Sequence, residues 1–148
     1  MTRDAADAET GAVTAEDAEA ARNALYRYAR AVDLADESLL AETFTGDVVL
    51  ERVDGSRVGR AAVLAFYRTV FDGPTLWSKH MVTNVTTEAT VEGLAVTAYF
   101  QAVSSTGSEA KAVFGEYRDV LVRQAGRLRI HRKRIDVQQS FPLAVRDA

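Results

Sequence analysis

The first part of the chain repeats apolar residues every three or four positions, which is the period of a helix that buries one face. Thr14 and Asp17 form a capping-box pattern at its start, so we expect a helix from Thr14 to about Leu34. The apolar positions that share its face are Ala18, Ala21, Leu25, Tyr28, Ala29 and Val32. Asp33 falls on the flank of this stripe, near the end of the helix.

Two more helices and a strand are expected before the pattern changes. The shorter helix follows the first, and its apolar anchors are Leu39, Leu40 and Phe44. Residues 48–53 have the apolar, β-branched character of a strand, and Asp54-Gly55 is a turn sequence. Helical spacing returns over residues 60–71.

From Ser78 onward, apolar and polar residues alternate with period two, which indicates strands. We expect four long strands with glycine-containing turns between them, at about 78–90, 94–105, 109–124 and 127–139. Helices followed by an antiparallel meander define an α+β fold. Because a sheet of long strands twists and coils, we expect a cone-shaped α+β barrel, with the N-terminal helices packed in a curved, mostly antiparallel sheet around a pocket.

The chain is expected to form one domain over residues 14–148, because 148 residues with 47% apolar content fit a single core. Residues 1–13 are small, acidic and uncapped, and we expect them to be a disordered N-terminal arm.

Charge and composition exclude several classes of partner. A net charge of −3 and a pI near 5.4 argue against a nucleic-acid surface, and the basic cluster between Arg127 and Arg134 is interpreted as a charged strand face. No apolar run approaches the ~20 residues that span a bilayer, and no signal-peptide pattern begins the chain. The absence of cysteine fits a reducing compartment, so we expect a cytoplasmic protein without a membrane partner.

His80 is the candidate acid or base, because the chain has only two histidines and imidazole titrates near neutral pH. Asp33 is its candidate partner, since a carboxylate fixes the tautomer of a histidine and stabilises its charged form. The alternative is a strand histidine bonded to backbone and a surface carboxylate. Asn84 shares alternation parity with His80 and is expected to line the same wall.

Aromatic residues supply further candidates. Tyr28 is a suitable neutral donor to a substrate carbonyl or leaving hydroxyl. Five positions separate it from Asp33, about 140° around an ideal helix, so a core role is the alternative. Trp77 and Phe100 are expected in the core or the pocket wall, where they would hold a flat apolar substrate.

Arg134 is the candidate for binding an anionic or enolate oxygen. It shares parity, together with Arg132, with the apolar residues Leu128 and Ile130, and therefore faces the pocket if these two face the core. The alternative is that a bulge or the edge of the cone returns both arginines to solvent. Arg129, His131 and Lys133 have the opposite parity and are expected to face away from the core. We therefore expect His131 to be exposed.

No metal ion or cofactor is expected. Two histidines predicted to point in opposite directions, in a chain without cysteine, provide no ligand set. The sequence contains no glycine-rich phosphate loop, nucleotide fingerprint or nucleophile elbow.

The order and spacing of three stretches resemble the SnoaL-like families of the nuclear-transport-factor-two superfamily. The stretches are the helix with Tyr28 and Asp33, the strand with His80 and Asn84 followed by 95–100, and the segments 115–123 and 128–134. The resemblance implies a cone-shaped α+β barrel and self-association as a homodimer or homotrimer through the outer sheet face. Dehydratases and a dehydrochlorinase of this superfamily pair an aspartate on the first helix with a histidine on the strand, as Asp33 and His80 do.

Accessory polar groups of these relatives are replaced in this chain. Phe100 stands where scytalone dehydratase has a second histidine. In the region where the bile-acid dehydratase has a further aspartate, this chain has Val103 and Ser104. Gly115 and Tyr117 stand where scytalone dehydratase has a serine and an asparagine, so Tyr117 joins the expected substrate-binding residues. Tyr28 matches a tyrosine of the bile-acid dehydratase.

The resemblance implies a cofactor-independent lyase or isomerase, dehydratase-like, with Asp33, His80 and Tyr28 as catalytic residues. Its expected substrate is a small apolar oxygenated molecule such as a polyketide, aromatic or terpenoid intermediate. Two alternatives stay open: a polyketide-type cyclase in which an aspartate is the chief acid, and a non-catalytic ligand-binding or assembly module like the β subunits of ring-hydroxylating dioxygenases.

Overall fold

The computed structural model describes residues 11–146, and these fold into three helices and a six-stranded sheet. The helices are α1 (Ala15–Asp33), α2 (Glu37–Thr43) and α3 (Arg60–Phe71). The strands are β1 (Phe44–Arg52), β2 (Gly55–Val58), β3 (Trp77–Ala89), β4 (Leu94–Ser105), β5 (Ala110–Gln124) and β6 (Arg127–Leu143). Of the arm expected at 1–13, residues 1–10 lie outside the described part. None of the helices in the described part is both long and apolar enough to cross a membrane.

The expected helices and long strands are confirmed, with ends shifted by a few residues. The hydroxyl of Thr14 caps α1 by accepting a hydrogen bond from the backbone N–H of Asp17 at 3.0 Å. Phe44 was expected to anchor the second helix, and that prediction is wrong: it begins β1, where its ring is fully buried. The short edge strand β2 was not expected, because its four residues are mostly exposed and carry no apolar alternation.

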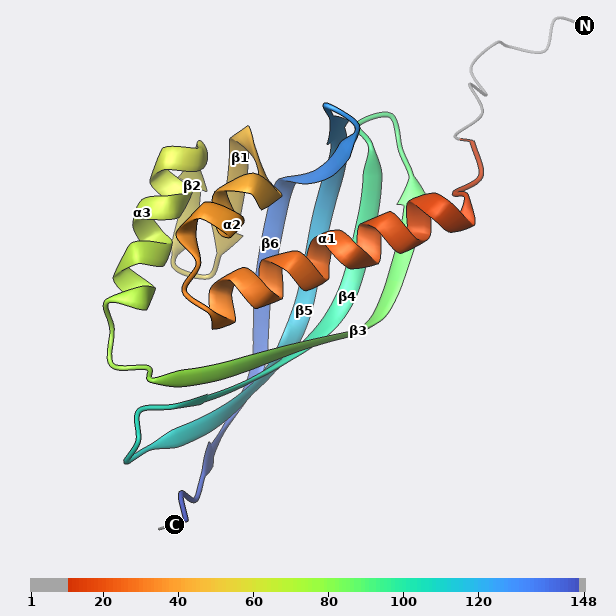
Figure 1. The fold of residues 1–148 in the computed structure, drawn as a ribbon. Helices are drawn as coiled ribbons and strands as arrows, with labels where there is room; N and C mark the ends of the chain where they lie inside the picture. Colours follow the sequence, from red (N-terminus) through yellow and green to blue (C-terminus); the bar gives the residue numbers. More distant parts are fainter. Residues whose placement is uncertain (1–10, 147–148) are drawn as a thin grey trace, which may run out of the picture.

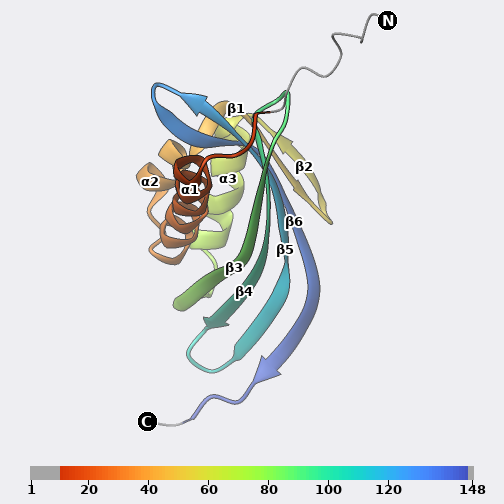
Figure 2. The ribbon, with the colours of Figure 1, turned by 90° about the vertical axis from the view of Figure 1, so that its right-hand side faces the viewer.

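The sheet has the strand order β2-β1-β6-β5-β4-β3, so β2 and β3 form its edges. All neighbouring strands are antiparallel except β1 and β6, which run parallel. The three helices lie together on the concave face of the sheet (Figure 1), and the edge-on view shows the long strands curving beneath them (Figure 2). The expected α+β architecture, helices packed in a curved and mostly antiparallel sheet, is confirmed.

Bulges in the long strands β3 and β6 bend the sheet and change which residues face inward. β3 carries one residue more than β4 between Thr83 and Thr86, where Asn84 has a φ of 52°. β6 carries one residue more than β5 at two places, beside His131 and beside Gln138. Because side chains alternate with period two, each extra residue reverses the inward set beyond it.

The bulge at His131 overturns the expected orientation of the residues that follow it. Ile130 faces the core as expected, but beyond the bulge the inward residue is Lys133, which is fully buried rather than outward-facing. Arg132 and Arg134 are both exposed, so the prediction that Arg134 reaches the pocket is wrong. The alternative of a bulge that returns both arginines to solvent describes the structure.

Asn84 is displaced by the same effect on β3. It was expected to share a wall with His80, but it lies at the bulge itself and its side chain is exposed. Val85 takes the inward-facing position that alternation predicted for Asn84, and it packs against the core. The prediction that Asn84 lines the pocket is therefore wrong.

A charged pair lies inside the apolar core, beneath the aromatic side chains. The ammonium of Lys133 donates to Oδ2 of Asp119 at 2.9 Å, and neither side chain is exposed. The same ammonium lies 3.6 Å from the ring centroid of Tyr117 and 4.1 Å from that of Tyr28. Burial raises the pKa of Asp119 and lowers that of Lys133, whereas the attraction between the two charges opposes both shifts.

Gly115→Ala is expected to destabilise the fold, because the added methyl group has no room. It would overlap the backbone oxygen of Asp136 and lie 2.7 Å from Cε1 of Phe100. We expect the free energy of unfolding in urea to fall by about 1–3 kcal/mol. Gly46→Ala is the matched control, since its methyl group meets nothing within 4 Å. Equal unfolding curves for the two variants would contradict the close approach at Gly115.

Asp119→Leu is expected to cost about 3–5 kcal/mol of unfolding free energy, because it leaves the ammonium of Lys133 buried without its carboxylate. The double variant Asp119→Leu/Lys133→Met leaves no buried charge and is expected to recover most of that loss. Urea unfolding of the two variants measures the difference. A double variant less stable than Asp119→Leu would show that the ammonium stabilises the core through the aromatic rings alone.

Candidate active site

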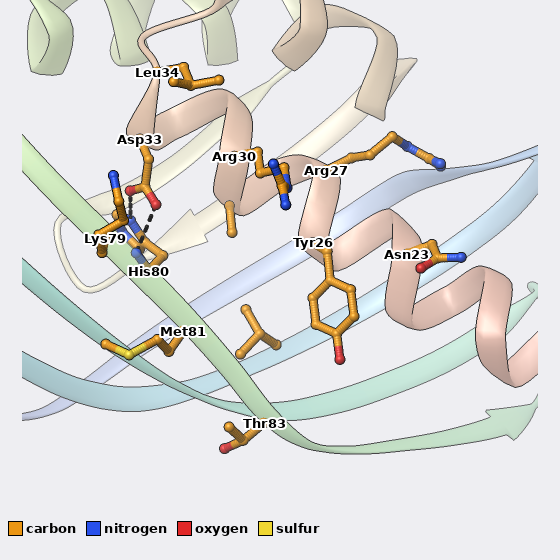
Figure 3. A pocket seen from close by; sticks show the side chains of 12 residues that line it. Asn23, Tyr26, Arg27, Arg30, Asp33, Leu34, Lys79, His80, Met81 and Thr83 are labelled. Atoms are coloured by element: carbon orange, nitrogen blue, oxygen red, sulfur yellow. Dashed lines mark hydrogen bonds and ion pairs between the residues drawn. The ribbon is translucent and has the colours of Figure 1, made fainter.

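Asp33, the last residue of α1, connects the end of this helix to the start of β3. Its Oδ1 accepts a hydrogen bond from the hydroxyl of Ser78 at 2.9 Å and lies 2.5 Å from Nδ1 of His80. Its Oδ2 accepts from the backbone N–H of His80 at 2.9 Å. Figure 3 shows the carboxylate and the imidazole facing each other between the helix and the strand. The two residues singled out in the sequence are thus in contact.

The hydrogen bonds of Asp33 decide its charge. Burial of the carboxyl group raises its pKa, but the hydrogen bonds from the ring and the backbone of His80, the charge of that ring and the hydroxyl of Ser78 lower it by more. The net effect is a pKa below the ordinary value of 3.8, so Asp33 is ionised at neutral pH. A negative charge at a helix C-terminus opposes the helix dipole, and these donors offset that cost.

The contact with Asp33 also determines the tautomer of His80. An ionised carboxylate only accepts hydrogen bonds, so the proton of a neutral His80 lies on Nδ1 and its Nε2 keeps a lone pair. The His80 side chain is 17% exposed and that of Asp33 is 9% exposed, so both are shielded without being sealed from a small molecule. This geometry leaves Nε2 of a neutral His80 free to accept a hydrogen bond or a proton.

A cavity of about 550 Å³ lies between the helices and the concave face of the sheet, and both His80 and Asp33 line it. Its volume is that of a small-molecule site. The predicted site residues that line it as well are Tyr28, Trp77, Phe100 and Tyr117. Trp77 is 50% exposed, which places it where the cavity meets solvent. The wall is largely aromatic and aliphatic, with a few polar groups.

Two of the aromatic residues form a stacked pair in this wall. The rings of Phe100 and Tyr117 stack with centroids 4.4 Å apart and an angle of 7° between their planes. Tyr28 meets Tyr117 edge-on at 5.9 Å, and the ammonium of Lys133 lies 3.6 Å from the Tyr117 centroid. The stack gives this wall a rigid aromatic surface.

The hydroxyl of Tyr28 is paired with that of Tyr67, which α3 contributes, at 2.5 Å. Burial raises the pKa of Tyr28 well above its ordinary value and that of Tyr67 to about 12, so both phenols are neutral at physiological pH. Within the pair one hydroxyl donates to the other, which leaves one O–H proton for a third oxygen. The pair can therefore donate to an oxygen of a molecule in the cavity.

A second hollow lies on the outer side of the same two residues. It has a volume of about 900 Å³ between α1 and β3, and Asp33 and His80 form part of its floor (Figure 3). Polar and charged side chains contribute to its lining, among them Asn23, Arg27, Arg30 and Lys79. Asp33 and His80 thus stand in the wall between an outer polar groove and an inner apolar cavity.

Two cavity residues were missed by the sequence interpretation. Arg52 shares alternation parity in β1 with Val48 and Leu50, both fully buried, and this signal indicates an inward arginine. Ser78 shares parity with His80 in the same way. The contact of the Tyr67 hydroxyl with Tyr28 joins two different helices, and helical spacing alone does not reveal it.

Arg134 and Asn84, which the bulges turn outward, do not contribute to the cavity. Over residues 11–146, no group of three or more histidine, aspartate or glutamate side chains is arranged to hold a metal ion.

Several solved structures share this fold. A scytalone dehydratase-like protein from Novosphingobium aromaticivorans aligns with a TM-score of 0.77 at 19% identity, covering 88% of this chain and 89% of that chain. An aromatic ring hydroxylase-like protein from the same organism aligns with a TM-score of 0.80 at 23% identity, covering 88% and 95%. A LinA-type3 hexachlorocyclohexane dehydrochlorinase from Novosphingobium barchaimii has a TM-score of 0.75 at 17% identity, covering 85% and 89%. No curated protein matches the chain significantly.

The family model of the SnoaL-like domain matches residues 13–134, which include the three helices, strands β1 to β5 and the first part of β6. This match spans most of the chain, and the fold of the solved structures agrees with it. The protein therefore belongs to the SnoaL-like domain family.

Proposed function

We propose that the protein is a cofactor-independent lyase or isomerase, dehydratase-like, that acts on a small apolar oxygenated molecule in the inner cavity. The observation that carries the proposal is the contact of 2.5 Å between Nδ1 of His80 and the ionised Asp33, in the wall of an aromatic-lined cavity. This is the one place among the described residues where a base, its charge partner and a ligand-sized space coincide.

In the proposed reaction, Nε2 of His80 removes a proton from a carbon next to a carbonyl group, and the electron pair of the C–H bond passes into an enolate. Asp33 stabilises the imidazolium that forms. In a dehydration, the imidazolium returns the proton to a hydroxyl group on the next carbon, the C–O bond breaks and water leaves. In an isomerisation, it returns the proton to another carbon.

The pair of Tyr28 and Tyr67 fits the electrophilic part of this proposal. Their shared hydroxyls retain one proton that can be donated to the enolate oxygen. A neutral donor held in a low-dielectric wall stabilises developing oxyanion charge without reorganising. The stacked rings of Phe100 and Tyr117 would hold the flat part of the substrate.

Relatives of similar fold favour an elimination. The names of two aligned proteins describe a dehydratase and a dehydrochlorinase, both lyases. The cyclase alternative needs an aspartate that acts as the chief acid, and the three hydrogen bonds that keep Asp33 ionised make it a poor proton donor. Proton abstraction by His80 therefore accounts better for the geometry.

His80→Gln and Asp33→Asn are expected to slow carbon deprotonation by about 10²–10⁴-fold, because each removes one half of the acid–base pair. The measurement is uptake of deuterium from D₂O, together with loss of water, by a panel of aromatic and alicyclic β-hydroxy ketones, followed by NMR and mass spectrometry. The wild-type protein is expected to exchange the carbon next to the carbonyl group.

The matched control for this experiment is His131→Gln. His131 is the second histidine of the chain, contacts Thr45 and Asp47 on the other side of the sheet, and does not line the cavity. It is expected to keep the wild-type rate. Exchange that survives in His80→Gln but is lost in Asp33→Asn would instead favour the cyclase-type chemistry.

The stability contributed by Asp33 is expected to depend on pH in a defined direction. Because the pKa of Asp33 is lower in the folded protein than its ordinary value of 3.8, its carboxylate stabilises the fold above that pH. This contribution is lost as the pH falls through the lowered pKa. Urea unfolding on either side of pH 3.8 should show the stability gap between wild type and Asp33→Asn narrowing on acidification. A gap that widens would contradict the ionised state assigned to Asp33.

A further inference from the structure

Arg52 brings a positive charge to the wall of the inner cavity. It is the last residue of β1, and alternation with the fully buried Val48 and Leu50 turns it toward the concave side of the sheet. There it lines the cavity together with Phe66 and Tyr67 of α3. Its side chain is 29% exposed, so most of the guanidinium-bearing chain is removed from solvent.

The guanidinium of Arg52 makes no hydrogen bond to any residue that the structure describes. Its buried Nε forms a long ion pair with Oδ1 of Asp54, at 3.5 Å. Arg57 occupies both oxygens of that carboxylate, with contacts of 3.3 and 3.2 Å. The ion pair with Asp54 thus engages only the Nε side of the group, and no hydrogen bond from the described residues reaches the terminal nitrogens. These nitrogens can donate to an acceptor that enters the cavity.

The neighbours of Arg52 indicate what kind of acceptor would bind there. Its guanidinium carbon lies 4.9 Å from the ring centroid of Phe66, so its flank is apolar and aromatic. Arg52 lines the same cavity as Tyr28 and Tyr67, so a planar charged donor and the paired hydroxyls face one ligand space.

We propose that Arg52 forms a carboxylate-binding subsite of the inner cavity, while the hydroxyl pair of Tyr28 and Tyr67 donates to the enolate oxygen, so that the natural ligand is an aromatic or alicyclic carbonyl compound that also carries a carboxylate. The inference deepens the proposed function and rests on it, because the same ligand presents its C–H bond to His80. Nothing in the family match or in the names of the similar structures assigns a role to Arg52.

A carboxylate fits this subsite better than a phosphate does. The guanidinium presents parallel N–H donors that match the two oxygens of a carboxylate in one plane. One arginine balances the single charge of a carboxylate, and the mainly apolar lining of the cavity suits the ring that carries it. The second cation that lines the cavity, Lys111, is an exposed residue of β5 and remains hydrated.

Binding is tested on the full chain with a charged probe and its neutral isostere, cyclohexanecarboxylate and cyclohexanecarboxamide. Trp77 is the only tryptophan of the chain and lines the cavity, so its fluorescence reports occupancy, and isothermal titration calorimetry gives the affinity. Arg52→Gln removes the charge, and Arg52→Lys keeps the charge but loses the planar fork. Arg134→Gln is the matched control, since Arg134 is exposed and does not line the cavity.

We expect the wild-type protein to bind the carboxylate at least about 10-fold more tightly than the amide, as a charge-assisted hydrogen bond provides. Arg52→Gln should abolish this preference, Arg52→Lys should keep part of it, and Arg134→Gln should keep all of it. Equal affinity for the two probes in the wild-type protein, or no binding of either, overturns the inference, and this comparison uses the wild-type protein alone. Loss of the preference in Arg134→Gln but not in Arg52→Gln overturns it as well.

The outcome is separable from that of the proposed function. Asp33→Asn and His80→Gln are expected to keep the preference for the carboxylate while losing deuterium exchange. An Arg52-dependent preference without exchange in any carboxylic acid would support the subsite and count against the lyase or isomerase. The opposite result is deuterium exchange in neutral ketones that Arg52→Gln leaves unchanged, with no preference for the carboxylate in the wild-type protein. It would support the lyase or isomerase and contradict the subsite.

Discussion

The bend of the long antiparallel sheet is the constraint on which the cavity depends. A flat sheet would meet the helices along their whole length and leave no space, whereas the bulges of β3 and β6 curve the strands beneath α1 and α3 (Figure 2). Where strands curve most, backbone and side chains crowd, and at Gly115 only a residue without Cβ fits between Asp136 and Phe100. The same crowding lets the rings of Phe100 and Tyr117 stack face to face.

The helix is held against this sheet by Asp33, whose carboxylate has both a structural and a chemical consequence. Its hydrogen bonds to Ser78 and His80 fix the end of α1 on the first residues of β3, the edge strand. A neutral residue would avoid the unfavourable helix dipole but would leave the His80 tautomer undefined. The carboxylate of Asp33 therefore lowers the stability of the helix end but fixes the tautomer of His80. Functional sites commonly have such locally unfavourable residues.

Periodicity predicted the elements well, because helix and strand periods depend on burial of one face and the chain follows them closely. It also predicted that Asp33 and His80 could meet, with the resemblance to the SnoaL-like families as its support. It failed for Arg134 and Asn84, since one extra residue in a strand reverses every side chain beyond it and bulges are set by pairing across the sheet. No bulge lies between Leu50 and Arg52 in β1, so alternation alone was enough to predict the orientation of Arg52.

Two cations lie against the inner aromatic wall, and they differ in whether the fold neutralises them. Lys133 has its carboxylate at 2.9 Å and two aromatic faces within 4.1 Å, so its charge is compensated inside the protein. Arg52 has no hydrogen bond from the described residues, because Arg57 holds the carboxylate that lies nearest. A charge compensated by the fold stabilises the core or specifies its packing. Arg52 shares its carboxylate with Arg57 through a longer ion pair, and its terminal nitrogens make no hydrogen bond to the described residues, so they can bind an acidic ligand. This is the physical distinction between the two residues.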